Sequence, residues 1–480
     1  MRFIPLFFFF VTSYVTGQTS LDLPNIVLII ADDIGWNDVG CYGNEVVKTP
    51  NMDRIAREGM RFDNAYLTTS SCSPSRTSII SGRYPHNTGA AELHTPLPPE
   101  VGIFPEKLQE AGYFTGQAGK WHMGNAPRRG FDVIYDGRDD LGPGGEKMWV
   151  PLLQNRPKDQ PFFLWLAATD AHRGWGPNMF EGQHHPEDVQ VPPFLVDSLG
   201  TRMDLAKYYD EIMRFDYYIG EVERELKVQG VADQTLIMII SDNGRPFPRC
   251  KTRLYDSGVK TPLIVKWPHG MNGKGQTSGS LVSVIDIGAT LLEVAGAPPL
   301  KSMQGQSFLK LFNAPNMPFR NYIFSEHNWH DHEALERMVR TRDYLYILNL
   351  RPNLPNQGPA DSNNSPSFVE LKDKRTKHQL TAAQVDVFLS PRPREELFDC
   401  QRDPLQLINI VADPAMDTKL SELRKIMMLW MEQTGDTHPE QLTPDWYSRE
   451  SGAALDIDRK RGEMPGASQS AVSVSDPGPF

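Results

Sequence analysis

Short apolar runs recur along the first part of the chain, and polar or helix-like segments separate them. They are rich in β-branched and aromatic side chains, without the polar alternation of a strand that has one wet face. Runs of this kind are typical of strands buried on both faces in a parallel sheet. We predict such strands at residues 25–31, 162–168, 235–240 and 262–265, and a further strand at residues 113–118.

Segments with helical periodicity lie between these strands. In residues 203–229 the spacing of Tyr208, Ile212, Phe215, Ile219, Val222 and Leu226 predicts a long amphipathic helix. Further helices are predicted at residues 49–60, 77–81, 104–111 and 284–295. The alternation of strand and helix predicts an α/β fold, with a large doubly wound, mostly parallel sheet flanked by helices over residues 22–320.

The pattern changes after residue 320. Strand-like runs at residues 322–325, 338–341 and 344–348 follow one another closely, and a Pro- and Asn-rich loop covers residues 353–367. A helix is predicted at about residues 415–433. We expect residues 321–435 to form a smaller C-terminal α+β domain with an antiparallel sheet. The Gly, Ser and Pro content of residues 459–480 predicts a disordered tail.

The N-terminus has the pattern of a signal peptide over residues 1–17. Arg2 precedes an apolar core, Phe3 to Val11, and small residues follow near Thr16 and Gly17. The core is too short to span a bilayer securely. We expect a mature chain without a membrane span, exported to the outside, the periplasm or the lysosomal lumen; an uncleaved anchor is the alternative.

Composition and charge narrow the classes of partner. The 39% hydrophobic content suffices for a sizeable core, and the net charge of −11 argues against general binding of nucleic acid or anionic membranes. An anionic substrate would therefore need a local basic pocket. Four cysteines are too few for a disulfide scaffold, although Cys41 and Cys250 could form one bridge.

Polar residues follow several of the predicted strands directly. Asp32 and Asp33 follow the first strand, and Asp242 and Asn243 follow the run at residues 235–240. In doubly wound sheets, ligands bind outside the carboxyl ends of the strands. These residues offer only oxygen ligands, which Ca²⁺ or Mg²⁺ prefers. A turn or helix cap is the alternative reading of each acidic pair.

One stretch, residues 70–78, carries the most specific signal. Its small hydroxyl residues around Pro74 are compatible with a plain turn and helix start. However, Cys72-Ser73-Pro74-Ser75-Arg76 resembles the C-x-P-S-R signature of type I sulfatases in the alkaline-phosphatase-like superfamily. The resemblance implies that a formylglycine-generating or anaerobic sulfatase-maturating enzyme converts Cys72 to formylglycine (3-oxoalanine), whose hydrated aldehyde is the nucleophile.

The resemblance extends over about residues 24–310 and implies roles for individual residues. One Ca²⁺, with Mg²⁺ as an alternative, would be bound by Asp32, Asp33, Asp242, Asn243 and the modified Cys72. Residues 396–399 resemble the family's C-terminal E-L-[YF]-D segment. The catalytic positions that match family motifs are Arg76, Lys120 and His122 (G-K-[WY]-H), His172 (D-x-H) and Lys251.

This chemistry is consistent with hydrolysis of a sulfate ester or N-sulfate. Cationic side chains and a metal would offset the charge of the sulfate oxygens in the transition state. Asp242 would act as a base for the attacking oxygen. His172 or Lys251 would protonate the leaving atom, and His122 would take the proton that releases the bound sulfate. Each histidine could instead be structural, Arg76 a surface charge and Lys251 a loop lysine.

The sequence says less about the substrate than about the reaction. Residues 241–248, with Asp170-Ala171-His172-Arg173, are similar to the heparan N-sulfatase branch, whereas Lys251 and the loops at residues 174–200 depart from it. We therefore expect a sulfated mono-, oligo- or polysaccharide, N- or O-sulfated. Candidate sugar-pocket residues, which could equally be solvated loop residues, are Glu92, His94, Arg173, His327, His332, Arg337 and Arg340.

Two other functions fit parts of the pattern. A phosphatase or phosphonate hydrolase of the same superfamily shares the acidic strand ends, but such enzymes usually carry more histidine ligands for a second metal. An inactive glycan-binding relative is the other alternative. It would be expected to have lost a metal ligand or the cysteine, and the sequence keeps both.

Overall fold

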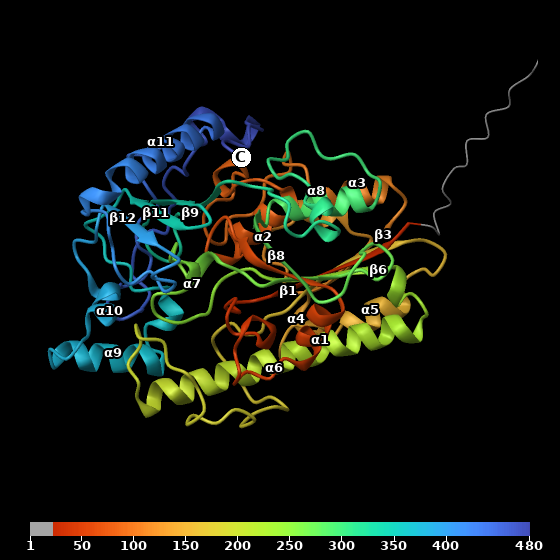
Figure 1. The fold of residues 1–480 in the computed structure, drawn as a ribbon, viewed down its shortest axis with the longest axis horizontal. Coiled ribbons are helices and arrows are strands. Elements are labelled where there is room, and N and C mark those ends of the chain that lie inside the picture. Colours follow the sequence, from red (N-terminus) through yellow and green to blue (C-terminus); the bar gives the residue numbers. More distant parts are fainter. Residues whose placement is uncertain (1–22) are drawn as a thin grey trace, which may run out of the picture.

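The computed structural model describes residues 23–480, so the predicted signal peptide at residues 1–17 lies outside the described part. Figure 1 shows a central sheet seen nearly edge-on, with helices above and below it and a smaller sheet beside it. Among the described residues, no helix combines the length and the apolar character needed to cross a bilayer.

The large sheet has eight strands in the order β4-β3-β5-β1-β6-β7-β2-β8. Neighbouring strands run parallel except that β7 is antiparallel to both β6 and β2. Strands β1, β5 and β6 are fully buried, as their apolar runs predicted. The bounds are β1 Asn25–Ala31, β2 Met60–Tyr66, β3 Phe114–Gly119, β4 Val133–Tyr135, β5 Phe162–Ala167, β6 Thr235–Ser241, β7 Leu263–Lys266 and β8 Gln276–Ser283.

Helices cover both faces of this sheet, which confirms the doubly wound α/β class (Figure 1). Two separate apolar clusters, one on each face, fill the space between helices and strands. One face carries α2 (Cys72–Ser81), α3 (Phe104–Glu110) and α8 (Asp286–Val294). The other carries α1 (Pro50–Glu58), α5 (Trp149–Asn155) and α6 (Leu199–Val228), the long helix that the sequence predicts.

A second sheet of four strands, in the order β12-β11-β10-β9, forms the core of the C-terminal part. All of its pairings are antiparallel, as predicted. Its strands are β9 (Ile323–His327), β10 (Glu336–Arg340), β11 (Tyr344–Asn349) and β12 (Glu395–Asp399). The helices of this part are α9 (Pro366–Thr376), α10 (Ala382–Val385) and α11 (Asp417–Thr434), and the part with the large sheet adds the short α4 (Arg138–Leu141) and α7 (Asp256–Val259).

The C-terminal residues differ from the expectation of a disordered tail over residues 459–480. The backbone carbonyls of Val472 and Val474 accept hydrogen bonds from Arg83, at 2.8 and 2.6 Å. Ala471 is 1% exposed, and the ring of Phe480 packs on Phe319. Composition predicted disorder because it does not reveal that main-chain carbonyls can be anchored by arginine and amide side chains elsewhere in the chain.

Candidate active site

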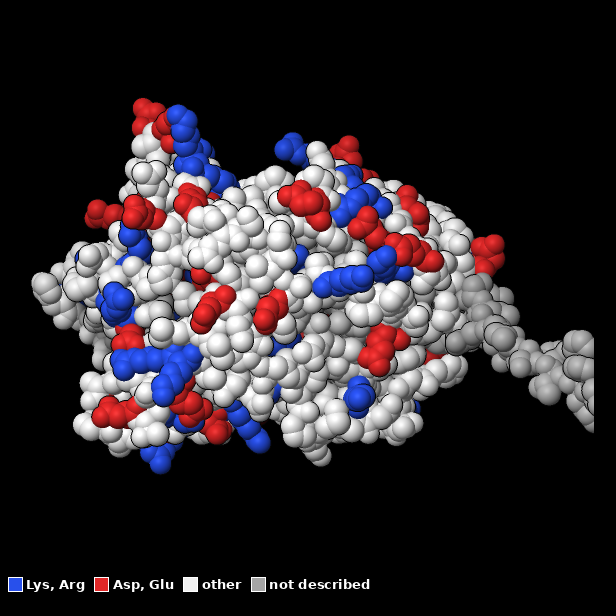
Figure 2. Space-filling model, turned by 90° about the horizontal axis from the view of Figure 1, so that it is seen from above, with Lys and Arg blue, Asp and Glu red and all other residues white. Residues whose placement is uncertain are grey.

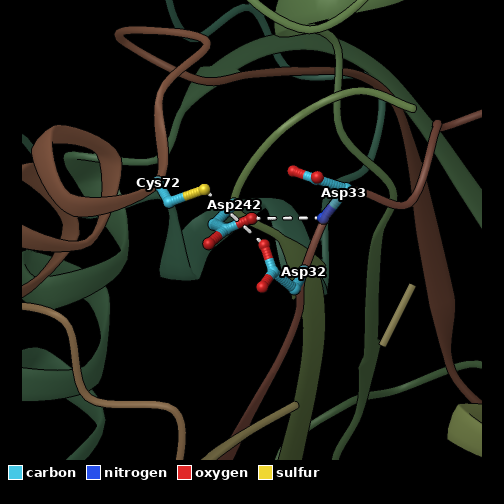
Figure 3. A group of neighbouring side chains, drawn as sticks. All are labelled: Asp32, Asp33, Cys72 and Asp242. Atoms are coloured by element: carbon cyan, nitrogen blue, oxygen red, sulfur yellow. Dashed lines mark hydrogen bonds between the residues drawn. The ribbon is translucent and has the colours of Figure 1, made fainter. Parts of the chain in front are cut away.

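The acidic pairs meet because β1 and β6 are adjacent parallel strands. Ala31 lies opposite Ser241 in the register of these strands, so the residues that follow both strands emerge side by side. The backbone N–H of Asp33 donates to Asp242 Oδ1 at 3.3 Å. Figure 3 shows the carboxylates of Asp32, Asp33 and Asp242 gathered at this edge. The predicted convergence at the carboxyl ends of the strands is therefore present.

Cys72 is the first residue of α2, and its side chain points toward these acids (Figure 3). Its Sγ lies 3.7 Å from Asp32 Oδ1 and accepts a hydrogen bond from Asn243 Nδ2 at 3.2 Å. The side chain is 2% exposed, and this burial raises the pKa of the thiol to about 12. An unmodified Cys72 is therefore a neutral thiol at physiological pH and a poor nucleophile.

The donor set fits a hard divalent cation. One ligand atom each from Asp32, Asp33, Cys72 and Asp242 lies within 4.8 Å of all the others. Asp33 Oδ1 and Asn243 Oδ1 are buried without a hydrogen-bond partner. Burial opposes the charge of both Asp33 and Asp242, although Lys251 and Arg76 pair with them, so a bound cation would stabilise the two carboxylates further. Oxygen-rich sites of this kind suit Ca²⁺ or Mg²⁺.

Three basic side chains face the carboxylates. Arg76 Nε donates to Asp242 Oδ2 at 2.7 Å, and Lys251 Nζ donates to Asp33 Oδ2 at 2.7 Å, in pairs that are fully buried. Lys120 pairs with Asp32, and Arg76 also donates to the Lys120 carbonyl at 3.0 Å. Burial opposes ionisation of Asp32, yet Lys120 and its other cationic neighbours lower its pKa. The site thus supplies the local basic pocket that the acidic chain requires.

The face of the molecule seen in Figure 2 carries interspersed acidic and basic side chains rather than a broad field of one sign. A cleft of about 550 Å³ opens beside Asp32, Lys120 and His172. It is also lined by Arg173 and Trp175. Lys120 and Arg173 thus place positive charge along the wall of this cleft, where it can attract an anion at short range.

The two predicted catalytic histidines border the site from different sides. His122 Nε2 lies 2.6 Å from His94 Nδ1, and burial lowers the pKa of His122 to about 2. His172 Nδ1 lies 3.0 Å from the Arg173 carbonyl, which can only accept, so Nδ1 carries a proton. The charge of Lys251, followed by burial, lowers the pKa of His172 to about 4. Both rings are neutral at physiological pH in the unliganded protein.

Three non-glycine residues around the site adopt left-handed backbone conformations. The φ values are +63° at Asp33, +63° at His94 and +61° at His122. Such conformations cost on the order of 1 kcal/mol or more each, and they persist only where surrounding contacts impose them. Their concentration at one site indicates that the fold holds these side chains in fixed directions.

The predicted sugar-pocket residues separate into three groups: arginines in buried ion pairs, residues that border the site, and Glu92. Arg337 and Arg340 are buried in ion pairs with Asp436 and Asp256 and do not line the cleft. Those that border the site or an adjoining small cavity are Arg173, His94, His327 and His332. Arg173 is held by Asp204, with N–O distances of 3.0 and 2.9 Å. Glu92 is 1% exposed and is bound by Thr443 and Arg461.

Several residues at the site were not predicted from the sequence. Asp361 Oδ2 lies 3.4 Å from His172 Nε2, and His330 Nδ1 lies 2.7 Å from the hydroxyl of Ser71. Trp329 packs in one apolar cluster with Cys72 and Leu93. All come from the C-terminal part: Asp361 lies in the loop predicted at residues 353–367, and Trp329 and His330 lie between the strands predicted at residues 322–325 and 338–341. No local motif marks them, and only the folded arrangement brings them to the site.

Comparison with known proteins agrees with this geometry. A family model described as Sulfatase matches residues 24–142 and 146–297, more than half of the chain. A second, described as N-sulphoglucosamine sulphohydrolase, C-terminal, matches residues 250–353.

The four cysteines are unpaired in the structure, so the possible Cys41–Cys250 bridge is not formed there.

Individual relatives cover most of the chain. An ulvan-active sulfatase of Formosa agariphila is 30% identical over 88% of this chain and 78% of its own. The human N-sulphoglucosamine sulphohydrolase is 32% identical over 88% of this chain and 92% of its own. A protein solved in complex with its substrate D-glucosamine-2-N,6-O-disulfate shares the fold, with a TM-score of 0.65, 21% identity, and coverage of 85% of this chain and 98% of that one. The chain therefore belongs to the sulfatase family and is a sulfuric ester hydrolase.

Proposed function

We propose that this protein is an exported sulfatase that removes sulfate from a sulfated carbohydrate through a formylglycine formed at Cys72 and a bound Ca²⁺. The observation that carries the proposal is the position of Cys72, buried at the start of α2 within reach of three carboxylates. When present, the formylglycine would supply a hydrated aldehyde as nucleophile, and the metal would neutralise the carboxylates and polarise a sulfate oxygen.

The side chains of this protein would prepare that reaction. Asp32, Asp33, Asp242 and Asn243 would hold the cation through oxygen atoms, and Arg76 fixes the direction of the Asp242 carboxylate at 2.7 Å. Lys120 and Lys251 would bind the sulfate oxygens. Burial opposes the charge on Lys251, but Asp33 outweighs it and raises its pKa, so this lysine keeps its proton. Fixed cations of this kind stabilise the charge of the transition state.

The histidines would move protons. His122 is neutral, and a ring nitrogen can accept a proton. His172 carries a proton on Nδ1, and its Nε2 faces Asp361 and Asp33. An anionic sulfate bound nearby would offset the charge of Lys251 and favour a second proton on Nε2. His172 would then donate that proton to the leaving oxygen or nitrogen, because Lys251 holds its own too tightly.

The alternatives have less support. Among the described residues, the group of possible metal ligands around Cys72 contains no histidine, whereas phosphatases of the superfamily usually carry histidine ligands for a second metal. The metal-binding residues and Cys72 are all present, which argues against an inactive glycan-binding relative. The activities for which the relatives are named, on N-sulphoglucosamine and on ulvan, support a sulfated sugar and keep both N- and O-sulfates as candidates.

Release of inorganic sulfate from a panel of defined sugars tests this proposal. The panel would hold N-sulfated glucosamine, 6-O-sulfated glucosamine, ulvan oligosaccharides and a phosphate monoester. The chain co-expressed with a maturation enzyme should release sulfate from at least one sulfated sugar. Cys72→Ala should release none, whereas Cys41→Ala, a control at a cysteine away from the site, should keep the rate. Release of phosphate but no sulfate would contradict the proposal.

A further inference from the structure

The C-terminal arm, residues 437–480, follows α11 and lies against the catalytic domain. Asn87 Nδ2 donates to the carbonyl of Ala471 in the arm and to that of Thr434 at the end of α11, both at 2.8 Å, and Gln304 donates to the carbonyl of Asp476 at 2.8 Å. Figure 1 shows this blue segment ending close to the orange segment that contains α2. The arm is therefore fixed to the same part of the chain that carries Cys72.

Aromatic side chains extend this contact to the wall of the active site. Trp446 of the arm packs on Trp329, with ring centroids 4.5 Å apart, and Trp329 donates to the carbonyl of Pro444 at 2.8 Å. Trp329, Leu93 and Cys72 form one buried apolar cluster, against which Trp446 packs. The guanidinium of Arg461 lies 5.1 Å from the Trp329 ring and 5.2 Å from the Trp446 ring.

Arg461 binds the backbone and side chain of the segment in front of the nucleophile. It donates to Glu92 Oε2 at 2.6 Å and to the Leu93 carbonyl at 2.5 Å. Glu92 is 1% exposed, and its second donor, Thr443 at 2.8 Å, also belongs to the arm. Both side-chain donors to this buried carboxylate thus come from a segment more than 300 positions away in sequence.

Two residues after Glu92, the same segment reaches a proposed catalytic histidine. The backbone N–H of His94 donates to Ser73 Oγ at 2.7 Å, next to Cys72. The His94 ring contacts His122 Nε2 at 2.6 Å. Since His94 is held in a left-handed backbone conformation, its ring direction depends on the anchoring of the residues before it.

We propose that the C-terminal arm forms part of the active-site wall and that Arg461 is a positioning residue, acting through Glu92 and His94 on His122. This inference rests on the proposed sulfatase function. The contacts of Arg461 are with Glu92, Leu93 and the rings of Trp329 and Trp446, so it would act through other residues and not on the reacting atoms. Its guanidinium holds the segment at residues 92–94 in place through hydrogen bonds to Glu92 and Leu93, so that the His94 ring orients His122. Small misplacements of a proton-transfer group lower the turnover rate more than substrate affinity.

The test compares arm variants on whichever sulfated substrate the wild type hydrolyses. Arg461→Met should lower kcat about tenfold or more, with KM within about twofold of wild type, because the ground-state contacts to substrate are kept. Arg461→Lys can still pair with Glu92 and should recover part of the rate. Lys460→Met is the matched control: this neighbouring lysine pairs only with Asp458 in solvent and should leave kcat unchanged.

Thermal unfolding separates a positioning role from a folding defect. If Arg461→Met does not fold, Thr443→Val removes the other donor to Glu92 with little change in volume, and kcat should still fall. The inference is overturned if Arg461→Met folds and has the same kcat as Lys460→Met. If Arg461→Met is unfolded, a wild-type kcat in Thr443→Val overturns it instead. Absence of sulfate release by the wild type itself would count against the proposed function instead.

Discussion

Asp361 provides a carboxylate from the C-terminal domain to the proposed proton donor. Its Oδ2 lies 3.4 Å from His172 Nε2, on the ring nitrogen that would face the leaving group. A carboxylate at this distance stabilises the protonated ring and helps to fix its orientation. His172 therefore receives contributions from both domains: Lys251 and Asp33 belong to the α/β domain, and Asp361 belongs to the C-terminal domain.

We predict that Asp361→Asn lowers kcat/KM about tenfold for a sulfated sugar, because proton donation to a poor leaving group is impaired. The loss should be smaller for an aryl sulfate whose leaving group needs little protonation. Steady-state kinetics with both substrates measures the difference. Asp373→Asn, an exposed acid of α9 paired with Lys377, serves as control. Equal losses on both substrates would exclude a role in protonating the leaving group.

At the level of single residues, the sequence was informative where a motif or a strand end marks the position. Asp32, Asp33, Asp242 and Cys72 were predicted together and lie together. Arg337 and Arg340 were expected to face a sugar, and each is instead neutralised by an aspartate distant in sequence. Such pairing has no local signature, since either arginine could equally have pointed into solvent or a pocket.

The end of strand β3 depends on a glycine. Gly119 has φ +99°, and a Cβ there would lie 1.8 Å from the Ala167 carbonyl oxygen of β5. The next residue, Lys120, donates its backbone N–H to that same carbonyl at 2.9 Å. The close approach of β3 and β5 therefore sets the position from which Lys120 reaches Asp32.

We predict that Gly119→Ala lowers the free energy of unfolding by about 2 kcal/mol or more, through left-handed strain and a backbone clash together. Gly112→Ala is the matched control, since φ is +89° and nothing lies within 4 Å of the added Cβ. Gly112→Ala should lower the free energy of unfolding only by the left-handed backbone strain, about 1 kcal/mol. Urea unfolding measures both, and equal values for the two variants would refute the clash.

Strands with continuous apolar runs were the most visible in the sequence, whereas β2, β4, β8 and β12 were not predicted as strands. Burial on both faces makes β1, β5 and β6 visible in the sequence. Strands β2 and β8 lie toward one edge of the sheet and mix polar with apolar residues. Their pairing is decided by the long-range parallel register between them, which local pattern does not contain.

For the molecule as a whole, the buried charges at the site predict a dependence on metal. Removing a bound cation would leave Asp33 and Asp242 buried beside Asp32 with fewer counter-charges. We expect chelation to abolish sulfate release and lower Tm, and added Ca²⁺ to restore both. Asp242→Ala should be inactive with or without Ca²⁺. A chelated, metal-free sample that kept the full rate of sulfate release would show that the reaction does not need the cation.

The relation between the two domains was the least predictable feature. The sequence indicated a large α/β part and a smaller α+β part, but not that Asp361, Trp329 and Arg461 reach back to the catalytic site. Composition made the C-terminal residues look disordered, whereas Arg83, Asn87 and Gln304 bind their backbone. Contacts of this kind form only where distant segments meet in the folded protein, so they leave no periodic pattern in the sequence.

The central claim is that a converted Cys72, held among buried acids, performs the attack on sulfur. The most direct measurement relates the rate of sulfate release to the fraction of Cys72 found converted by mass spectrometry, in batches matured to different extents. The account predicts a rate proportional to that fraction, reaching zero in Cys72→Ala. A rate that is independent of the converted fraction, or that persists in Cys72→Ala, would contradict it.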